Sequence, residues 1–220
     1  MTFTLLAADP RTGLLGAAAA SRSLAVGNAV ISIDPGVGVV ASQAWTNRAL
    51  RARMLDALAT GERPSRVVER VTEWDQEAER RQVAAMLPTG EADTRTGTET
   101  TDWAGAIVRP GVVVLGNLLT GSDVLQAVAD TFEAGAADVS DDAGTIGHLA
   151  RRMVAAMLAG EAAGGDRRGR QSAAVLVARA REGRVFPPEL DIDLRVDDDE
   201  APLHRLAALV DAQLRARGEG

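Results

Sequence analysis

The first 43 residues alternate between apolar runs and turn-forming residues, a pattern that predicts paired β-strands. Residues 3–8 form an apolar run, residues 9–13 contain Asp, Pro and Gly, and residues 14–21 form a second apolar run. Apolar runs of this length on either side of a short turn are typical of a β-hairpin. Residues 36–43 follow Asp34 and Pro35 and predict a third strand.

Helical spacing of apolar residues appears in five later segments. Residues 46–60 carry leucine and methionine three or four positions apart, which places them on one helical face. A second helix is expected from Pro64, with a valine stripe that ends at Trp74. Further helices are expected after Ser122, from Ile146 and from Leu203, with Ser122 as the N-cap of its helix.

The remaining apolar runs predict strands at residues 81–87, 103–109, 112–115, 172–179 and 191–197. The stretch 88–101 between two of them is polar and rich in Gly and Thr, and residues 135–144 are expected to be a mobile loop. Strands therefore come in blocks, with pairs of helices between the blocks. This order favours a layered α+β fold in one domain, residues 1–220, over the strict alternation of a doubly wound fold.

Composition supports a globular protein. Of 220 residues, 46% are hydrophobic and 25% are charged, and the apolar residues are spread along the chain. No apolar run approaches the roughly 20 residues that span a bilayer. The first residues lack the basic start and long apolar core of a signal peptide, so a cytoplasmic bacterial protein without membrane contact is expected.

Two residue types are missing, and their absence excludes several chemistries. The chain has no cysteine, which excludes disulfides and thiolate metal sites. It also has no lysine, which excludes a lysine nucleophile, Schiff base or general base. His148 and His204 lie on predicted helices without neighbouring ligand types, so neither a metal nor a cofactor is expected. The net charge of −7 argues against a nucleic-acid partner.

Residues 164–170 form the densest polar cluster, called here the Gly/Arg loop. Its two spaced glycines superficially resemble a phosphate-binding loop, but Arg170 and Gln171 replace the Lys-Ser/Thr pair, and the loop enters a strand rather than a helix. Two interpretations remain. The loop is a tight turn whose arginines pair with carboxylates, or Asp166, Arg167, Arg168 and Arg170 bind an anionic ligand.

Thr2 is the candidate nucleophile. Removal of Met1 from a chain that begins Met-Thr would leave a free threonine amine. Such an amine can take the proton of its own hydroxyl, so one residue supplies both nucleophile and base. Its pKa of roughly 7.7–8.0 suits that role near neutral pH. The alternative interpretation is that Thr2 merely starts the first strand.

Several segments together resemble the bacterial and archaeal domain of unknown function 1028 family. The matching runs are TFTLLAADPRTGLLGAAAASRSLAVGNAV, GVGVVASQAWTN, RRQ, DWAG, GNLL, AGGDRRGRQSAA and DLRVDDD, which span nearly the whole chain. The chain departs from that family at residues 95–101, where Arg-Thr-Gly and a threonine pair replace Phe-Thr-Gly and cysteine. It departs again at Asp199, where members have histidine.

The resemblance implies an N-terminal-nucleophile (Ntn) hydrolase-like fold, a four-layer αββα sandwich of two antiparallel sheets. The first hairpin is also similar to the start of proteasome β-subunits, where a strand beginning with Thr returns as an Ala-rich strand ending in Ser-Arg, here Ser21 and Arg22. Those subunits use a lysine in catalysis, and this chain has none. The α-amine is therefore the expected base.

Two functions follow as hypotheses. The first is an amidase or small-peptide hydrolase in which Thr2 attacks and Ser21, Asn47 or Asn117 donates to the oxyanion. The second is a catalytically silent domain that holds a small anionic ligand or a sister subunit. The residues expected to bind a ligand are Arg22, Gln43, Asp166, Arg167, Arg168 and Arg170.

Two tryptophans bear on assembly. Trp74 precedes a charged run, a combination that suits the anchor and rim of a subunit contact, and Trp45 adds a second aromatic group. A homodimer is the expected assembly, because closed twofold symmetry is the commonest. The alternative is that Trp74 completes the valine stripe and belongs to the core.

Overall fold

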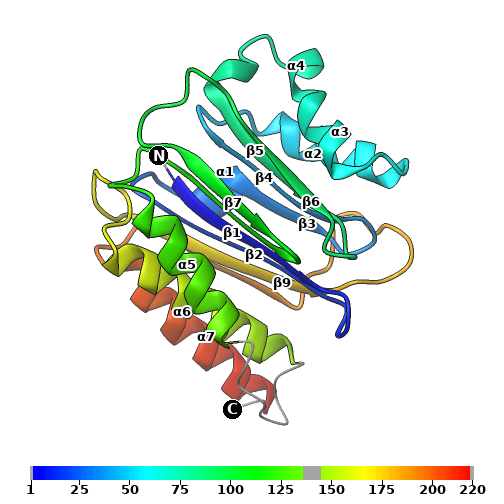
Figure 1. The fold of residues 1–220 in the computed structure, drawn as a ribbon. Helices are drawn as coiled ribbons and strands as arrows, with labels where there is room; N and C mark the ends of the chain where they lie inside the picture. The colour runs from blue at the N-terminus through cyan, green and yellow to red at the C-terminus, as the bar shows by residue number, and fades with distance from the viewer. Residues whose placement is uncertain (1, 136–144, 219–220) are drawn as a thin grey trace.

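The structure is a computed structural model that describes residues 2–135 and 145–218 (Figure 1). The strands are β1 (Thr2–Asp9), β2 (Leu14–Ser21), β3 (Ile31–Asp34), β4 (Gly38–Ala44), β5 (Arg81–Met86), β6 (Ala92–Thr96), β7 (Gly105–Arg109), β8 (Val112–Asn117), β9 (Ser172–Arg179) and β10 (Ile192–Val196). The helices are α1 (Val26–Val30), α2 (Ala49–Ala59), α3 (Pro64–Glu69), α4 (Val71–Trp74), the 3-10 helix η1 (Ala78–Arg80), α5 (Asp123–Ala134), α6 (Ile146–Ala162) and α7 (Pro202–Arg217).

The strands form two antiparallel sheets. The six-stranded sheet has the order β10-β9-β2-β1-β8-β7, and the four-stranded sheet has the order β3-β4-β5-β6. Helices α5, α6 and α7 cover one side, while α2, α3 and α4 cover the other (Figure 1). The expected α+β architecture with two antiparallel sheets and covering helices is therefore confirmed.

Buried apolar side chains form three separate clusters, one between each pair of neighbouring layers. The first lies between α5–α7 and the six-stranded sheet, the second between the two sheets, and the third between the four-stranded sheet and α2–α3. Successive side chains of a strand point to opposite faces, so each central strand contributes to two of these clusters. In β1, Phe3 and Leu5 face the helices, whereas Leu6 and Ala8 face the other sheet.

The predicted N-terminal hairpin is confirmed as β1 and β2, and it occupies the middle of the six-stranded sheet. Asp9 Oδ1 accepts a hydrogen bond from the backbone N–H of Arg11 at 2.9 Å, which stabilises the turn. Gly13 has a φ of 68°, a left-handed conformation that glycine adopts without a Cβ penalty. Gly16 of β2 lets α6 approach closely, because an added Cβ would lie 2.4 Å from Met153 Sδ.

The structure differs from the sequence predictions in four respects. The polar stretch 88–101, for which no strand was predicted, contains β6, which pairs with β5 at the sheet edge, where partly exposed strands tolerate polar residues. The pattern also missed α1 and β3, which are only five and four residues long. Helix α2 begins at Ala49 rather than 46. Ser122 lies at the N-cap position but makes no capping hydrogen bond.

The long helix α6 does have a side-chain cap, which the sequence analysis did not identify. Thr145 Oγ1 accepts a hydrogen bond from the backbone N–H of His148 at 3.1 Å. Of the expected mobile loop, residues 136–144 lie outside the described residues. Within the described ranges, no helix combines the length and apolar character needed to cross a membrane.

Candidate active site at the start of the first strand

Polar residues end four neighbouring strands of the six-stranded sheet and lie in one row. The register pairs Thr2 with Asn117 of β8, and Ser21 of β2 with Ser172 of β9. Phe3 pairs with Ala20, so Thr2 and Ser21 fall opposite each other. All four polar residues are buried, with exposed fractions of at most 5%. Their side chains face the four-stranded sheet, because the alternate positions further along these strands contribute to the cluster between the sheets.

Thr2 is held by hydrogen bonds on two sides. Its hydroxyl donates to Ser21 Oγ at a distance of 3.3 Å. Its carbonyl oxygen accepts from Nε2 of Gln43, a residue of the opposite sheet, at 3.3 Å. The start of β1 is therefore fixed both within its own sheet and across the space between the sheets.

Two glutamines continue this arrangement into the four-stranded sheet. Thr4 donates to Gln43 Oε1 at 2.7 Å, and Gln43 Nε2 also donates to Gln82 Oε1 at 2.8 Å. Asn117 Nδ2 donates to the same Gln82 oxygen at 3.2 Å. These four residues, Thr4, Gln43, Gln82 and Asn117, are called here the inter-sheet polar network.

Gln82 is the centre of this network. Its Nε2 lies 3.0 Å from the carbonyl oxygen of Gly116 and 3.1 Å from that of Gly105, both in the six-stranded sheet. It also lies 3.0 Å from Thr96 Oγ1 in β6. Gln82 is 0% exposed, so these partners replace water completely. A buried amide without them would be strongly unfavourable.

The three expected oxyanion donors occupy different places. Ser21 and Asn117 both flank Thr2 within the row of polar residues. Asn47 lies in the loop between β4 and α2, where its Nδ2 donates to Asp75 Oδ2 at 2.8 Å. Its Oδ1 accepts the backbone N–H of Ala49 at the start of α2. No hydrogen bond joins Asn47 to Thr2 in the part of the chain that the structure describes.

Asp75 anchors the loop that contains Asn47. The Arg81 guanidinium donates to the Asp75 carboxylate at 2.8 Å, and the two side chains are 9% and 7% exposed. Hydrogen bonding to Arg81 is the largest influence on this carboxyl, with further hydrogen bonds from Asn47 and the backbone of Glu77. Together they lower the pKa of Asp75 from 3.8 to about 2. This ion pair lies at the start of β5, next to Gln82.

The Gly/Arg loop is organised around the carboxylate of Asp166. Asp166 Oδ2 accepts the backbone N–H of Arg22 at 2.7 Å, and Oδ1 accepts that of Arg168 at 2.8 Å. Asp166 also forms an isolated β-bridge with Leu119. The loop therefore joins the end of β2 to the segment after β8, next to the row of polar residues.

Every arginine expected to bind a ligand has a protein partner. Arg22 Nη1 donates to Gln171 Oε1 at 3.0 Å, and Arg167 Nη2 donates to the Leu119 carbonyl at 3.2 Å. Arg168 contacts the Asp166 carboxylate at 3.3 Å, and Arg170 Nε lies 3.1 Å from Glu161 Oε1. These contacts favour the tight-turn interpretation of the loop, whereas its ligand-binding role stays a prediction.

A small cavity of about 230 Å³ opens beside Ser21 and the Gly/Arg loop. Phe3 and Ala20 line it from the sheet, and Glu161 and Arg170 supply its charges. Burial raises the pKa of Glu161, although Arg170 opposes the effect. Ser21 lines this cavity, whereas Thr2 is not among its lining residues.

Neither tryptophan decides the assembly. Trp74 is partly buried against the cluster between the four-stranded sheet and α2–α3, with the Arg70 guanidinium 4.8 Å from its ring centre. Trp45 is 54% exposed, and Arg80 lies 4.5 Å from its ring centre. The contact of Trp74 with the core supports the core interpretation, and the homodimer stays a prediction.

Among the described residues, no group of three or more His, Asp or Glu side chains is arranged to hold a metal ion. Sequence reasoning missed three members of the site, Thr4, Gln82 and Ser172. Each is a polar residue at an inward-facing position of an otherwise apolar strand. That signal was present in the sequence, because a strand whose inward positions are apolar except at one end indicates a polar end of the core.

Comparison with known proteins places the chain in a family. The model for the family of unknown function DUF1028 matches residues 2–206. The crystal structure of a protein from Silicibacter pomeroyi, described as a member of that family, is 33% identical with a TM-score of 0.82. The alignment covers 97% of this chain and 89% of that one.

A second solved structure, Anbu from Hyphomicrobium sp. strain MC1, is 12% identical and has a TM-score of 0.38. The alignment covers 100% of this chain and 98% of that one, but the similarity is too low to support an argument. A comparison with curated proteins gives no match. On its family match and its similarity to the Silicibacter protein, this chain belongs to the DUF1028 family.

Proposed function

We propose that this protein is an amide hydrolase of the Ntn type, which acts on a small amide with Thr2 as nucleophile after removal of Met1. The observation that carries the proposal is the position of Thr2. It begins a central strand, its hydroxyl contacts Ser21, and its carbonyl is held by Gln43 from the opposite sheet. Two antiparallel sheets between helical layers are also the architecture that the Ntn hydrolase-like resemblance implies.

The proposed reaction needs only groups that Thr2 and its neighbours supply. The α-amine of Thr2 takes the hydroxyl proton as Oγ1 attacks the substrate carbonyl carbon, forming a tetrahedral oxyanion. The amine then returns the proton to the leaving nitrogen as the C–N bond breaks and an ester remains on Thr2. Water, deprotonated by the same amine, hydrolyses the ester and releases a carboxylic acid. Because the chain has no lysine, the proposal assigns the role of base to the α-amine of Thr2.

Ser21 and Asn117 are the proposed oxyanion donors because both flank Thr2. Preorganised donors of this kind contribute about 10²–10³-fold each to the rate of acyl transfer. Asn47, which holds Asp75 and the start of α2, is assigned a positioning role in place of the donor role expected from the sequence.

Acylation by a β-lactone probe tests the nucleophile directly. Opening of the lactone by Thr2 Oγ1 would form an ester and add the mass of one probe molecule. The wild-type protein should gain that mass on its N-terminal peptide, and the Thr2→Val variant should gain none. Valine keeps the shape of threonine but lacks the hydroxyl.

Thr72→Val is the control for a threonine outside the site. Thr72 of α4 is exposed, and its hydroxyl donates to the carbonyl oxygen of Glu69. Its substitution removes a threonine hydroxyl without touching Thr2 or the inter-sheet polar network, so labelling should persist. A wild-type protein that stays unlabelled, or a Thr2→Val variant that is labelled as strongly as wild type, would overturn the proposal in favour of a catalytically silent domain.

A further inference from the structure

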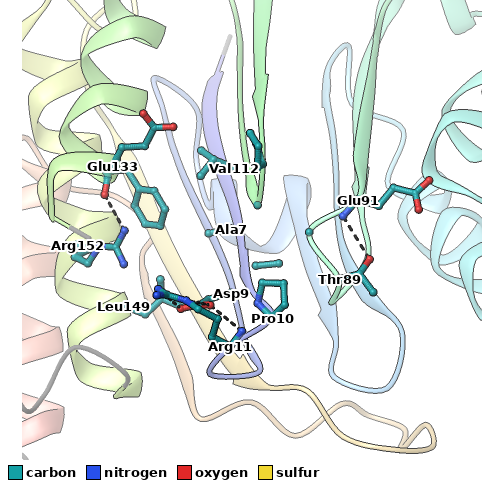
Figure 2. Close-up of a pocket in the computed structure, with 15 residues that line it drawn as sticks. Ala7, Asp9, Pro10, Arg11, Thr89, Glu91, Val112, Glu133, Leu149 and Arg152 are labelled. Atoms are coloured by element: carbon teal, nitrogen blue, oxygen red, sulfur yellow. Dashed lines mark hydrogen bonds and ion pairs between the residues drawn. The ribbon is translucent and has the colours of Figure 1, made fainter. Parts of the chain in front are cut away.

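A cavity lies at the opposite end of β1 from Thr2 (Figure 2). Its volume is about 500 Å³, and it is bordered by the β1–β2 turn, the start of β8, and helices α5 and α6. An eight-residue strand places its two ends roughly 23 Å apart, at about 3.3 Å per residue. A ligand in this turn-end cavity would therefore not reach Thr2.

The walls of the turn-end cavity are mainly apolar. Ala7 and Val112 line it from the six-stranded sheet, and Leu149 and Phe132 line it from the helices. Figure 2 shows Leu149 and Arg152 reaching from α6 towards the sheet residues. Mostly apolar walls with a few polar groups, enclosing several hundred Å³, are typical of sites for small organic ligands.

Each acidic residue that lines the cavity already has an arginine partner. Asp9 pairs with Arg11 at 3.3 Å across the turn. Glu91 pairs with Arg63 at 2.7 Å. The third carboxylate, Glu133, pairs with Arg109 of β7 at 2.6 Å. These carboxylates are therefore neutralised within the protein.

Arg152 differs from these residues: within the described part of the chain, no carboxylate lies within ion-pair distance of its guanidinium. Its Nη2 donates to the carbonyl oxygen of Phe132 at 2.8 Å, and its Cζ lies 4.3 Å from the Phe132 ring centre. Its Nε is buried and makes no hydrogen bond. Burial lowers the pKa of Arg152, and the nearby Arg11 guanidinium adds to this effect, whereas the Asp9 carboxylate opposes it.

We propose that the turn-end cavity binds a small monocarboxylate with an apolar body, and that Arg152 is its anchor. The carboxylate would accept hydrogen bonds from the terminal nitrogens of the Arg152 guanidinium, while the apolar body would cover Leu149, Val112 and Phe132. Because the three acidic residues around the cavity are already paired, Arg152 offers one positive charge, which matches a ligand with a single carboxylate. Nothing in the proposed hydrolase reaction requires this site.

Calorimetric titration of the wild-type protein with three matched probes tests the ligand class. Octanoate, octan-1-ol and octylamine share an apolar chain and differ in head-group charge. Octanoate should bind saturably and at least about 10-fold more tightly than the alcohol. Hydrogen bonds between charged groups strengthen binding by about that factor or more. Octylamine should not bind. No saturable binding of octanoate, or equal affinity for the alcohol, would overturn the proposal.

Arg152→Gln and Arg151→Gln form a matched pair on α6. Arg151 is the neighbouring residue, pairs with Asp211 at the surface and does not line the turn-end cavity. Octanoate affinity should fall about 10-fold or more in Arg152→Gln and stay within about twofold in Arg151→Gln. Equal affinity in both variants would overturn the assignment of Arg152. If Arg152→Gln does not fold, the three wild-type titrations decide the matter.

A Thr2→Val variant separates this proposal from the proposed hydrolase. It should bind octanoate as the wild type does, because Thr2 lies at the far end of β1. A loss of octanoate binding in that variant would instead show that the two ends form one site, and would overturn the placement of the ligand at the turn end.

Discussion

At the Thr2 end of β1, buried polar side chains hydrogen-bond to one another across the space between the sheets. At the Asp9 end, by contrast, the acidic side chains around a cavity form ion pairs with arginines. Thr4, Gln43, Gln82 and Asn117 satisfy one another, and all are at most 2% exposed. Around the turn-end cavity the acidic residues pair with surface arginines, and Arg152 keeps a buried nitrogen without a partner.

The two ends of β1 differ in how fully their polar groups are paired within the protein. A fully satisfied network fixes side chains in single positions, which is what a nucleophile and its oxyanion donors need. A cavity lined by a cation without an acidic partner, here Arg152, can bind an anionic ligand through that cation. The same strand therefore carries a preorganised polar end at Thr2 and an open, receptive end at Asp9.

Removal of the central glutamine should have the largest effect on stability. Gln82→Leu would leave the carbonyl oxygens of Gly105 and Gly116 and the amides of Gln43 and Asn117 short of a partner. We expect the free energy of unfolding, measured by urea denaturation, to fall by about 3–5 kcal/mol.

The exposed Gln126 of α5 gives the control for that substitution. Gln126→Leu should change the unfolding free energy by less than about 0.5 kcal/mol. A Gln82→Leu variant as stable as Gln126→Leu would show that the inter-sheet polar network does not hold the Thr2 end together.

The Gly/Arg loop should show the next largest effect. Asp166→Ala removes the acceptor of two backbone N–H groups, those of Arg22 and Arg168, so we expect a loss of about 2–3 kcal/mol in unfolding free energy. Asp198→Ala is the exposed control, because it removes only a contact with Gln171.

The effect of added anions on the melting temperature separates the two interpretations of the loop. If the loop is only a tight turn, added phosphate or carboxylate should leave the melting temperature of wild type and Asp166→Ala unchanged. A rise in the wild type that disappears in Arg168→Ala would establish the loop as an anion site.

The Asp75–Arg81 ion pair predicts a pH dependence. The pKa of Asp75 is about 2 in the folded protein and 3.8 in the unfolded chain, so its contribution is complete above about pH 5 and is lost as the pH falls through 2. Asp75→Asn should cost about 2 kcal/mol at pH 7. Roughly half of that difference should remain at pH 3, measured by denaturation at both pH values. A difference that is constant between the two would contradict the assignment to this carboxylate.

Arg152→Leu should have the smallest effect. The substitution loses a hydrogen bond to Phe132 and a ring contact but also removes an unpaired buried charge. We expect the unfolding free energy to change by less than about 1 kcal/mol. A loss above about 2 kcal/mol would mean that Arg152 braces α5 and α6, and the contrast between the two ends of β1 would fail.

Local patterns predicted most of the fold. The hairpin of β1 and β2 follows from two apolar runs around a turn, and the long helices follow from apolar spacing. The missed elements are those in which tertiary pairing outweighs local preference. Strand β6 is polar because it lies at a sheet edge, and α1 begins after Ala25, a non-glycine residue with a φ of 53°.

The candidate site was less accessible to sequence reasoning. Thr2 was identified from its position after Met1, and Ser21 from the similarity of the first hairpin to the start of proteasome β-subunits. Gln82 was not, since its partner Gln43 lies 39 residues away and only the packing of two sheets joins them. The choice between the two interpretations of the Gly/Arg loop could not be made for the same reason, because the pairing of Arg170 with Glu161 depends on where α6 ends.

Maturation at the N-terminus tests the central claim most directly, because the proposed base exists only once Thr2 carries the α-amine. The intact mass of the protein, expressed without a tag, should be lower than that of the full sequence by one methionine. Since the sequence contains no lysine, an amine-reactive label should then attach once, on the peptide that begins with Thr2. A retained Met1 would contradict the account, because the amine would be one residue away from the hydroxyl that it must deprotonate.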